Sequence, residues 1–188
     1  MTYEVRQLFV AGAEVQRPQP GDLFLTHDDY WAAKVIRIGQ RLRYHGEVRK
    51  YAFWNHAGAF LDADGTIVEA MGQGVVIRNI SKYQNRTYAV VRITATEADR
   101  AQMVRFYRSQ AEQRASYGYA TIVSIGLTLV TGSKFSFTSH ASHICSGLCA
   151  AGITRGDYVL EQSPVHTMPA DLAKMFDVPG PSNLFWQL

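Results

Sequence analysis

Short stretches of β-prone residues predict a small sheet of consecutive antiparallel strands. Two of them, residues 55–61 and 66–70, flank residues 62–65, a run of turn formers that is typical of a hairpin. The remaining predicted strands are residues 21–26, 75–80 and 88–93.

Helical periodicity follows in other segments. One predicted helix begins at a cap on Asp28 or Asp29, runs to about residue 42 and carries an apolar stripe of Trp31, Val35, Ile38 and Leu42. Thr96 with Asp99 three residues later fits a capping box for a helix to about residue 115, with an inner stripe of Ala101, Val104, Tyr107 and Ala111. Residues 119–130 are apolar almost all round, which predicts a buried helix or the wall of an apolar pocket. A last short helix is expected up to residue 176.

These elements predict a single α+β domain over residues 1–188, with residues 1–20 as a lead-in and residues 177–188 as a tail. The hydrophobic content of 47% and the charged content of 19% are ordinary for a globular protein. Residues 1–14 lack the pattern of a secretory signal, and no apolar stretch is long enough to span a bilayer. We therefore expect a cytoplasmic protein without a transmembrane segment, although export by a signal-free route would leave no trace in the sequence.

Cys145 is the residue with the strongest chemical signal. Ser142 is the expected N-cap of a short helix, with Ser139 as an alternative, so Cys145 falls in the first helical turn. The unpaired backbone N–H groups and the macrodipole there favour a thiolate, which is the nucleophilic form. Cys149 lies four residues later, and we expect it to be a reduced, buried neighbour.

His56 and Glu69 lie on the two strands of the predicted hairpin. If Leu61 faces Thr66, then Gly58 faces Glu69, and His56 points to the same side as Gly58. We expect Gly58 to leave empty space beside both side chains. A register slip of one residue would move Glu69 to the other face, so this pairing depends on the turn.

The ordered segments Pro20-Gly21-Asp22-Leu23-Phe24-Leu25, Asn55-His56-Ala57-Gly58, Ile67-Val68-Glu69-Ala70 and Ile144-Cys145-Ser146 resemble the circularly permuted papain-like cysteine amidases of the NlpC type, the YaeF/YiiX-like group. The resemblance covers residues 20–176 and implies a permuted papain-like fold in which the histidine and acidic strands precede the cysteine helix. It further implies Cys145 as nucleophile, His56 as general base and Glu69 as the residue that orients the base.

The resemblance implies a cysteine hydrolase that cleaves an amide through a thioacyl intermediate, without a cofactor. Its substrates would be peptides, cell-wall peptides of peptidoglycan or lipid-linked acyl groups. The alternatives are a lipid acyltransferase or thioesterase of the lecithin–retinol acyltransferase type and an inactive domain that binds lipid or peptide. Tyr117 or Tyr119 would add a donor to the oxyanion site.

Other chemistry fits the sequence less well. His140, His143, Cys145 and Cys149 are potential zinc ligands, but they come from one short segment rather than from two separated pairs, so we expect no metal site. His143 is two residues from Cys145 and would point away from it on a helix. The Gly-x-Ser-x-Gly elbow of serine hydrolases is absent from the sequence.

Basic residues follow the first predicted helix at Lys34, Arg37 and Arg41. They form either a solvated face or a contact for an anionic ligand such as a phospholipid or a cell-wall glycan. The net charge of +3 permits such a ligand without requiring it. No base-reading or stacking motif accompanies these cations, so nucleic acid is not expected as a partner.

Overall fold

The structure is a computed structural model that describes residues 5–9, 17–29, 31–71, 74–113 and 145–181. Six antiparallel strands form one sheet in the order β1-β6-β2-β3-β4-β5. Their bounds are β1 (Val5–Phe9), β2 (Leu23–Thr26), β3 (His56–Phe60), β4 (Thr66–Met71), β5 (Gly74–Asn79) and β6 (Tyr88–Val91). The predicted α+β class is confirmed, and the five predicted strands are present with ends that differ by one or two residues.

The first strand corrects the sequence prediction. Residues 1–20 were expected to be a lead-in, but β1 pairs with β6 along one edge of the sheet. Its ladder shifts register between Val5 and Gln7. The sequence of Val5–Phe9 accordingly does not alternate regularly between apolar and polar residues, which is the pattern that identifies a strand in a sequence.

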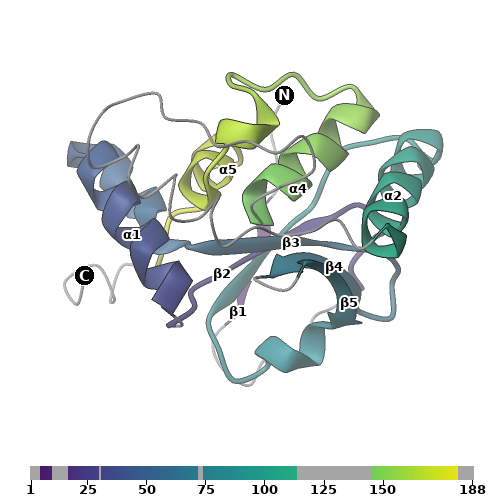
Figure 1. The fold of residues 1–188 in the computed structure, drawn as a ribbon, viewed down its shortest axis with the longest axis horizontal. Coiled ribbons are helices and arrows are strands. Elements are labelled where there is room, and N and C mark those ends of the chain that lie inside the picture. Colours follow the sequence, from purple (N-terminus) through teal and green to yellow (C-terminus); the bar gives the residue numbers. More distant parts are fainter. Residues whose placement is uncertain (1–4, 10–16, 30, 72–73, 114–144, 182–188) are drawn as a thin grey trace.

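The helices are α1 (Trp31–Arg43), α2 (Glu97–Glu112), α4 (Cys145–Ile153) and α5 (Pro169–Met175), and the 3-10 helices are η1 (Gly46–Phe53), η2 (Ile80–Tyr83), η3 (Thr154–Gly156) and η4 (Pro164–His166). In Figure 1, α4 and α5 lie together on one side of the sheet, while α1 and α2 lie toward its two ends. The predicted helix over residues 119–130 lies outside the described residues. Within the described segments, no helix combines the length and the apolar character needed to cross a bilayer.

The sheet separates two apolar clusters, as strand alternation requires. The larger cluster joins one face of the sheet to α2, α4 and α5, and it includes Leu23, Ala59, Tyr107, Cys149 and Leu172. The smaller cluster lies on the other face against η2 and includes Phe24, Phe60, Ile67 and Tyr83. Alternation places His56, Gly58 and Glu69 on this second face, in line with Phe60 and Ile67.

Helix α2 begins as the sequence predicts. Thr96 Oγ1 accepts a hydrogen bond from Asp99 N at 3.2 Å, and Asp99 Oδ2 accepts one from Thr96 N at 3.2 Å, which completes a capping box. Tyr107 is buried as expected, but Ala101 is exposed and Met103 occupies the inner face instead. Gly21, just before β2, explains why Met103 lies on the inner face of α2. A Cβ on Gly21 would lie 3.1 Å from the Met103 sulfur, so the absence of a side chain there leaves room for Met103 to pack on the backbone.

Two residues of the apolar stripe predicted for α1, Ile38 and Leu42, do not face inward. Ile38 and Leu42 are 54% and 55% exposed, whereas Ala33, Ile36 and Gln40 are among the described residues of α1 that are buried. Gln40 is the physical reason, since its Nε2 donates to Trp54 O at 2.8 Å and its Oε1 accepts from Ala170 N at 2.9 Å. These bonds join α1 to η1 and α5 and compensate for the burial of a polar side chain.

A buried carboxylate fixes the beginning of β2. Asp22 accepts hydrogen bonds from the backbone N–H of Gln19 at 2.9 Å and of Ile93 at 3.1 Å. Arg100 of α2 adds a charged contact at 3.0 Å. Asp22 is fully buried, and the Gly-Asp segment is therefore structural, because it ties β2 to the end of β6 and to α2.

Candidate active site

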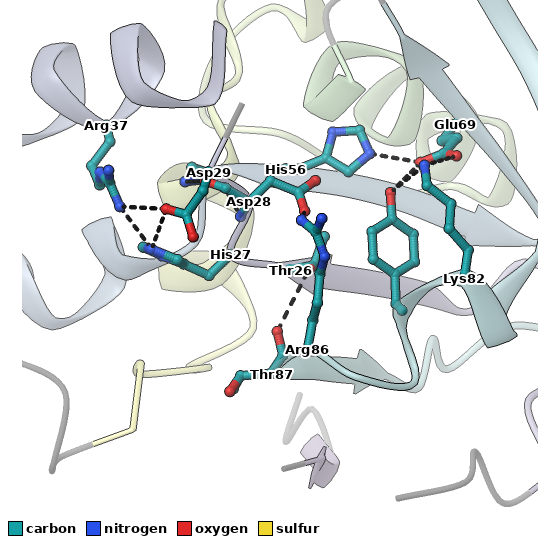
Figure 2. A network of polar contacts seen from close by, with 12 residues as sticks. Thr26, His27, Asp28, Asp29, Arg37, His56, Glu69, Lys82, Arg86 and Thr87 are labelled. Atoms are coloured by element: carbon teal, nitrogen blue, oxygen red, sulfur yellow. Dashed lines mark hydrogen bonds and ion pairs between the residues drawn. The ribbon is translucent and has the colours of Figure 1, made fainter. Parts of the chain in front are cut away.

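The β3–β4 hairpin has the register that the sequence predicts. Leu61 N donates to Thr66 O at 2.7 Å, and Gly58 faces Glu69. Asp62 Oδ1 accepts from the backbone N–H of Asp64 at 3.0 Å and of Thr66 at 2.9 Å, which closes the turn. The consequence is a hydrogen bond of 2.9 Å between His56 Nε2 and Glu69 Oε2, both fully buried (Figure 2).

Gly58 is needed for a reason that differs from the expected one. The space beside it is not empty, because a Cβ on Gly58 would lie 2.4 Å from the ring of Phe24 and 2.7 Å from Val68 O. Phe24 faces Gly58 across the β2–β3 ladder. Its ring meets that of His56 edge-on at a centroid distance of 6.3 Å, so it packs against the imidazole and keeps it dry.

Cys145 is the first residue of α4, and its side chain is 2% exposed. Small residues let this helix pack closely, since Gly152 lies so near Tyr107 that a Cβ would be 2.0 Å from the ring. Ser146 Oγ donates to Thr167 O at 2.6 Å and anchors the first turn. The helix packs on β3, and Cys145 lies close enough to His56 to raise the pKa of that histidine.

The structure therefore brings the three predicted residues together, because Glu69 bonds His56 and Cys145 acts on the pKa of His56. Because Glu69 bonds His56 Nε2, Nδ1 is the ring nitrogen that would exchange a proton with a nucleophile. Burial lowers the pKa of His56, but the charge and the hydrogen bonds of Cys145 and Glu69 outweigh it and raise that pKa to about 10. Burial likewise raises the pKa of Glu69, but His56, Tyr83 and Lys82 outweigh it and lower that pKa to about 2.

Two residues of this network were missed in the sequence. Tyr83 Oη donates to Glu69 Oε2 at 2.5 Å, and Lys82 Nζ donates to Glu69 Oε1 at 2.9 Å. Both belong to η2, which follows β5 in the sequence and returns across Glu69. The available signal was a tyrosine inside the polar run of residues 81–87, which is otherwise typical of a solvated loop.

The strand end that carries His56 is braced from the preceding loop. Asn55 exchanges two hydrogen bonds with the backbone of Asp28, at 2.7 Å and 2.8 Å. The Asp28 carboxylate in turn pairs with Arg86. Asp28 is one of the two residues expected to cap the α1 helix, and it is engaged with Asn55 and Arg86 beside the His56 strand, as Figure 2 shows in part.

The three cations predicted as an anion contact lie in different environments. Arg37 donates to His27 Nε2 at 2.7 Å and lies 3.7 Å from Asp29, so it is already engaged (Figure 2). Lys34 is exposed. Burial, together with the nearby guanidinium groups of Arg37 and Arg49, lowers the pKa of Arg41.

Several candidates lie elsewhere or outside the described residues. Tyr117, Tyr119, His140 and His143, and the expected caps Ser139 and Ser142, are among the residues that the structure does not describe. Cys149 is reduced and buried, and desolvation raises its pKa well above the usual range. In the described part of the chain, no cluster of three or more His, Cys, Asp or Glu side chains is arranged to hold a metal ion.

A surface cavity of about 330 Å³ opens between residues 159–162 and α5. Thr167 is in its lining, and the carbonyl of Thr167 accepts the Ser146 hydrogen bond, but none of Cys145, His56 and Glu69 contributes to the lining. The cavity is therefore separate from these three residues, and the candidate site rests on the bonded His56–Glu69 pair and the nearby Cys145. In the comparisons with known proteins, no family model matches this chain and no curated protein does either.

Proposed function

We propose that this protein is a cysteine hydrolase that cleaves an amide through a thioacyl intermediate, in a papain-like domain of permuted order. Cys145 is the nucleophile, His56 the general base and acid, and Glu69 the residue that orients the imidazole. One observation carries the proposal: the fully buried 2.9 Å bond between His56 and Glu69, with Cys145 close enough at the beginning of α4 to raise the pKa of His56.

The resting state of the pair follows from the charges around it. Glu69 remains a carboxylate near neutral pH because its pKa is lowered to about 2. The pKa of His56 is raised to about 10, since the charge and hydrogen bonding of Cys145 and Glu69 outweigh the cost of burial. A protonated His56 beside an ionised Glu69 is therefore the favoured arrangement near neutral pH, and a thiolate at Cys145 is the form that the proposed mechanism requires.

In the proposed reaction, the Cys145 thiolate attacks the carbonyl carbon of the amide and forms a tetrahedral oxyanion. The backbone N–H of Cys145, at the beginning of α4, is the natural donor to that oxyanion. His56 then gives its Nδ1 proton to the amine nitrogen as the C–N bond breaks, which leaves a thioester. Water then attacks the thioester while His56 takes one of its protons. The C–S bond breaks, the acid leaves, and the thiolate–imidazolium pair is regenerated.

The fold orients His56 for both steps. Glu69 fixes the ring through Nε2, so Nδ1 keeps its direction toward the thiol as the proton moves in and out. The ring of Phe24 against His56 and the bonded Asn55 before it limit other ring positions. Such preorganisation reduces the reorganisation that each proton transfer requires.

The first test is the reactivity of the two cysteines. Iodoacetamide at mildly acidic pH should label Cys145 and leave Cys149 unlabelled, as measured by peptide mass spectrometry. Cys145→Ala should abolish turnover with the fold intact because alanine suits a helix, whereas Cys149→Ala should keep most activity. A dead Cys149→Ala protein together with an active Cys145→Ala protein would overturn the assignment.

The second test concerns the acyl group and its acceptor. Peptidoglycan fragments and phospholipids should be incubated side by side with the protein and with Cys145→Ala, and the products identified by mass spectrometry. Release of a free acid supports hydrolysis, whereas an acyl group on an added alcohol or amine supports an acyltransferase. If Cys145 is labelled rapidly but neither substrate class gives a product, both proposed substrate classes are wrong. The reactivity of Cys145 would then still support its assignment as the nucleophile.

A further inference from the structure

We propose that Tyr83 and Lys82 are positioning residues that fix the Glu69 carboxylate and withdraw part of its negative charge from His56. This inference rests on the proposed function, because it concerns how the general base is set. It assigns a role to η2, a segment that contains none of the three reacting or orienting residues.

The geometry around Glu69 supports this role. His56 Nε2 and Tyr83 Oη both bond the same carboxylate oxygen, Oε2, at 2.9 Å and 2.5 Å. Lys82 Nζ bonds the other oxygen, Oε1, at 2.9 Å, and Arg78 of β5 lies 3.8 Å from it. Donors on both oxygens hold the carboxylate plane against rotation, and Glu69 itself is fully buried.

The two η2 residues also hold each other. Lys82 Nζ donates to Tyr83 Oη at 3.1 Å and lies 4.7 Å from the centre of the Tyr83 ring. Asn79 caps η2 through a 2.9 Å bond from Ser81 N. The Tyr83 ring also packs 5.4 Å from that of Phe24, the residue that covers Gly58 and meets the His56 ring. This packing links η2 to the His56 strand by an aromatic contact as well as by the carboxylate.

The consequence for His56 follows from charge sharing. A carboxylate oxygen that accepts from Tyr83 is a weaker acceptor for His56, and the Lys82 cation offsets the charge that stabilises an imidazolium. Among the described residues, the charged and titratable groups next to the His56–Glu69 pair are Cys145 from α4, Arg78 from β5, and Lys82 and Tyr83 from η2. Removal of either η2 donor should therefore make His56 hold its proton more strongly.

The test is the titration of His56, followed by NMR on protein with ¹³C-labelled histidine and assigned with His56→Gln. Tyr83→Phe keeps the ring and removes the donor, and Lys82→Met removes the cation. In both variants the His56 midpoint should rise by about one pH unit, the scale of one hydrogen bond to a charged group. Lys82→Arg keeps the cation and should restore the wild-type midpoint.

Matched controls separate this effect from general changes. Tyr51→Phe removes a tyrosine–carboxylate bond of 2.5 Å to Asp177, and Lys174→Met removes a lysine that lies 3.9 Å from Glu161. Neither should move the His56 midpoint. An unchanged midpoint in both Tyr83→Phe and Lys82→Met, or an equal rise in the controls, would overturn the proposal.

Stability and reactivity provide independent readouts. Lys82 is 32% exposed, so Lys82→Met should fold and carries the test even if Tyr83→Phe does not. If wild-type Cys145 is not labelled at mildly acidic pH, the proposed function fails, whereas the NMR titration still decides the role of η2. Reactive Cys145 with an unmoved His56 midpoint would overturn the role of η2 alone.

Discussion

His27 and His56 occupy neighbouring strand ends, yet their surroundings drive them to opposite charge states. His56 faces Thr26 across the β2–β3 ladder, and His27 is the next residue in the sequence. Burial lowers the pKa of both rings. For His56 the charge and hydrogen bonding of Cys145 and Glu69 outweigh burial and raise the pKa, whereas the pKa of His27 stays lowered.

The hydrogen bonds of His27 explain its neutrality. The carbonyl of Phe53 can only accept, so His27 Nδ1 carries the proton of that 2.7 Å bond. Nε2 then has a lone pair and accepts from Arg37 at 2.7 Å. A second proton on the ring would face the Arg37 cation directly. Burial beside a cation therefore favours a neutral histidine, whereas burial beside the Glu69 carboxylate favours a protonated one.

The largest difference is expected between His56→Ala and His27→Ala. Loss of His56 removes the cationic partner and the proton shuttle together, so labelling of Cys145 at mildly acidic pH should fall sharply and turnover by about 100-fold or more. His27→Ala should leave the labelling rate close to that of the wild type. Iodoacetamide labelling against pH, with turnover, checks both. Unchanged labelling in His56→Ala would mean that another histidine, first of all His140, is the base.

A smaller loss is expected for Glu69→Gln. Glutamine can still accept a hydrogen bond from His56 but loses the charge, so the pKa of His56 should fall and turnover should fall less than in His56→Ala. The residues act as a unit, so the double variant should be scarcely worse than His56→Ala alone. The same kinetic measurement tests this, and additive losses would contradict it.

The two histidines also predict opposite effects of pH on stability. The pKa of His56 is raised from 6.5 to about 10, so its contribution is complete below pH 6.5 and lost as pH rises through about 10. The pKa of His27 is lowered from 6.5, so its contribution is present above that pH and lost as pH falls through its folded value. Thermal unfolding should therefore show a smaller alkaline loss for His56→Gln and a smaller acid loss for His27→Gln. Parallel curves for both variants and the wild type would contradict the two charge states.

The smallest effect is expected at the cations of α1, on the His27 side. Arg37 is engaged with His27 and Asp29, whereas Lys34 is exposed and Arg41 lies near other cations. If this face contacts an anion, the double variant Lys34→Gln/Arg41→Gln should bind anionic vesicles or glycans more weakly, by about fivefold for each cation removed at low salt. The loss of binding should become smaller as the salt concentration rises. Arg37→Gln should change binding less.

A control with the same charge change separates the α1 face from net charge. Arg105 and Arg108 of α2 are exposed, and their replacement by Gln should leave binding unchanged. No binding by the wild type at any salt concentration would leave the solvated-face interpretation standing.

The sequence was sufficient where the determinants are local. The turn formers of residues 62–65 set the Leu61–Thr66 pairing, and that register alone placed Glu69 opposite Gly58 and on the side of His56. The Thr96–Asp99 capping box was predictable for the same reason, because each partner lies within one helical turn of the other. The meeting of Cys145 with this pair was implied by a family resemblance and by the order of the elements, not by spacing along the chain.

Tertiary structure decided what depends on contacts between distant segments. Phe24 fills the space over Gly58, Gln40 rather than Leu42 faces inward on α1, and Tyr83 and Lys82 return to Glu69 from beyond β5. Periodicity along a chain identifies the faces of an element but not which neighbour covers each face. Backbone hydrogen bonding within a few residues therefore specified the hairpin and the α2 cap. The environment of the imidazole, and with it the charge state, follows from packing between strands and helices that are remote in sequence.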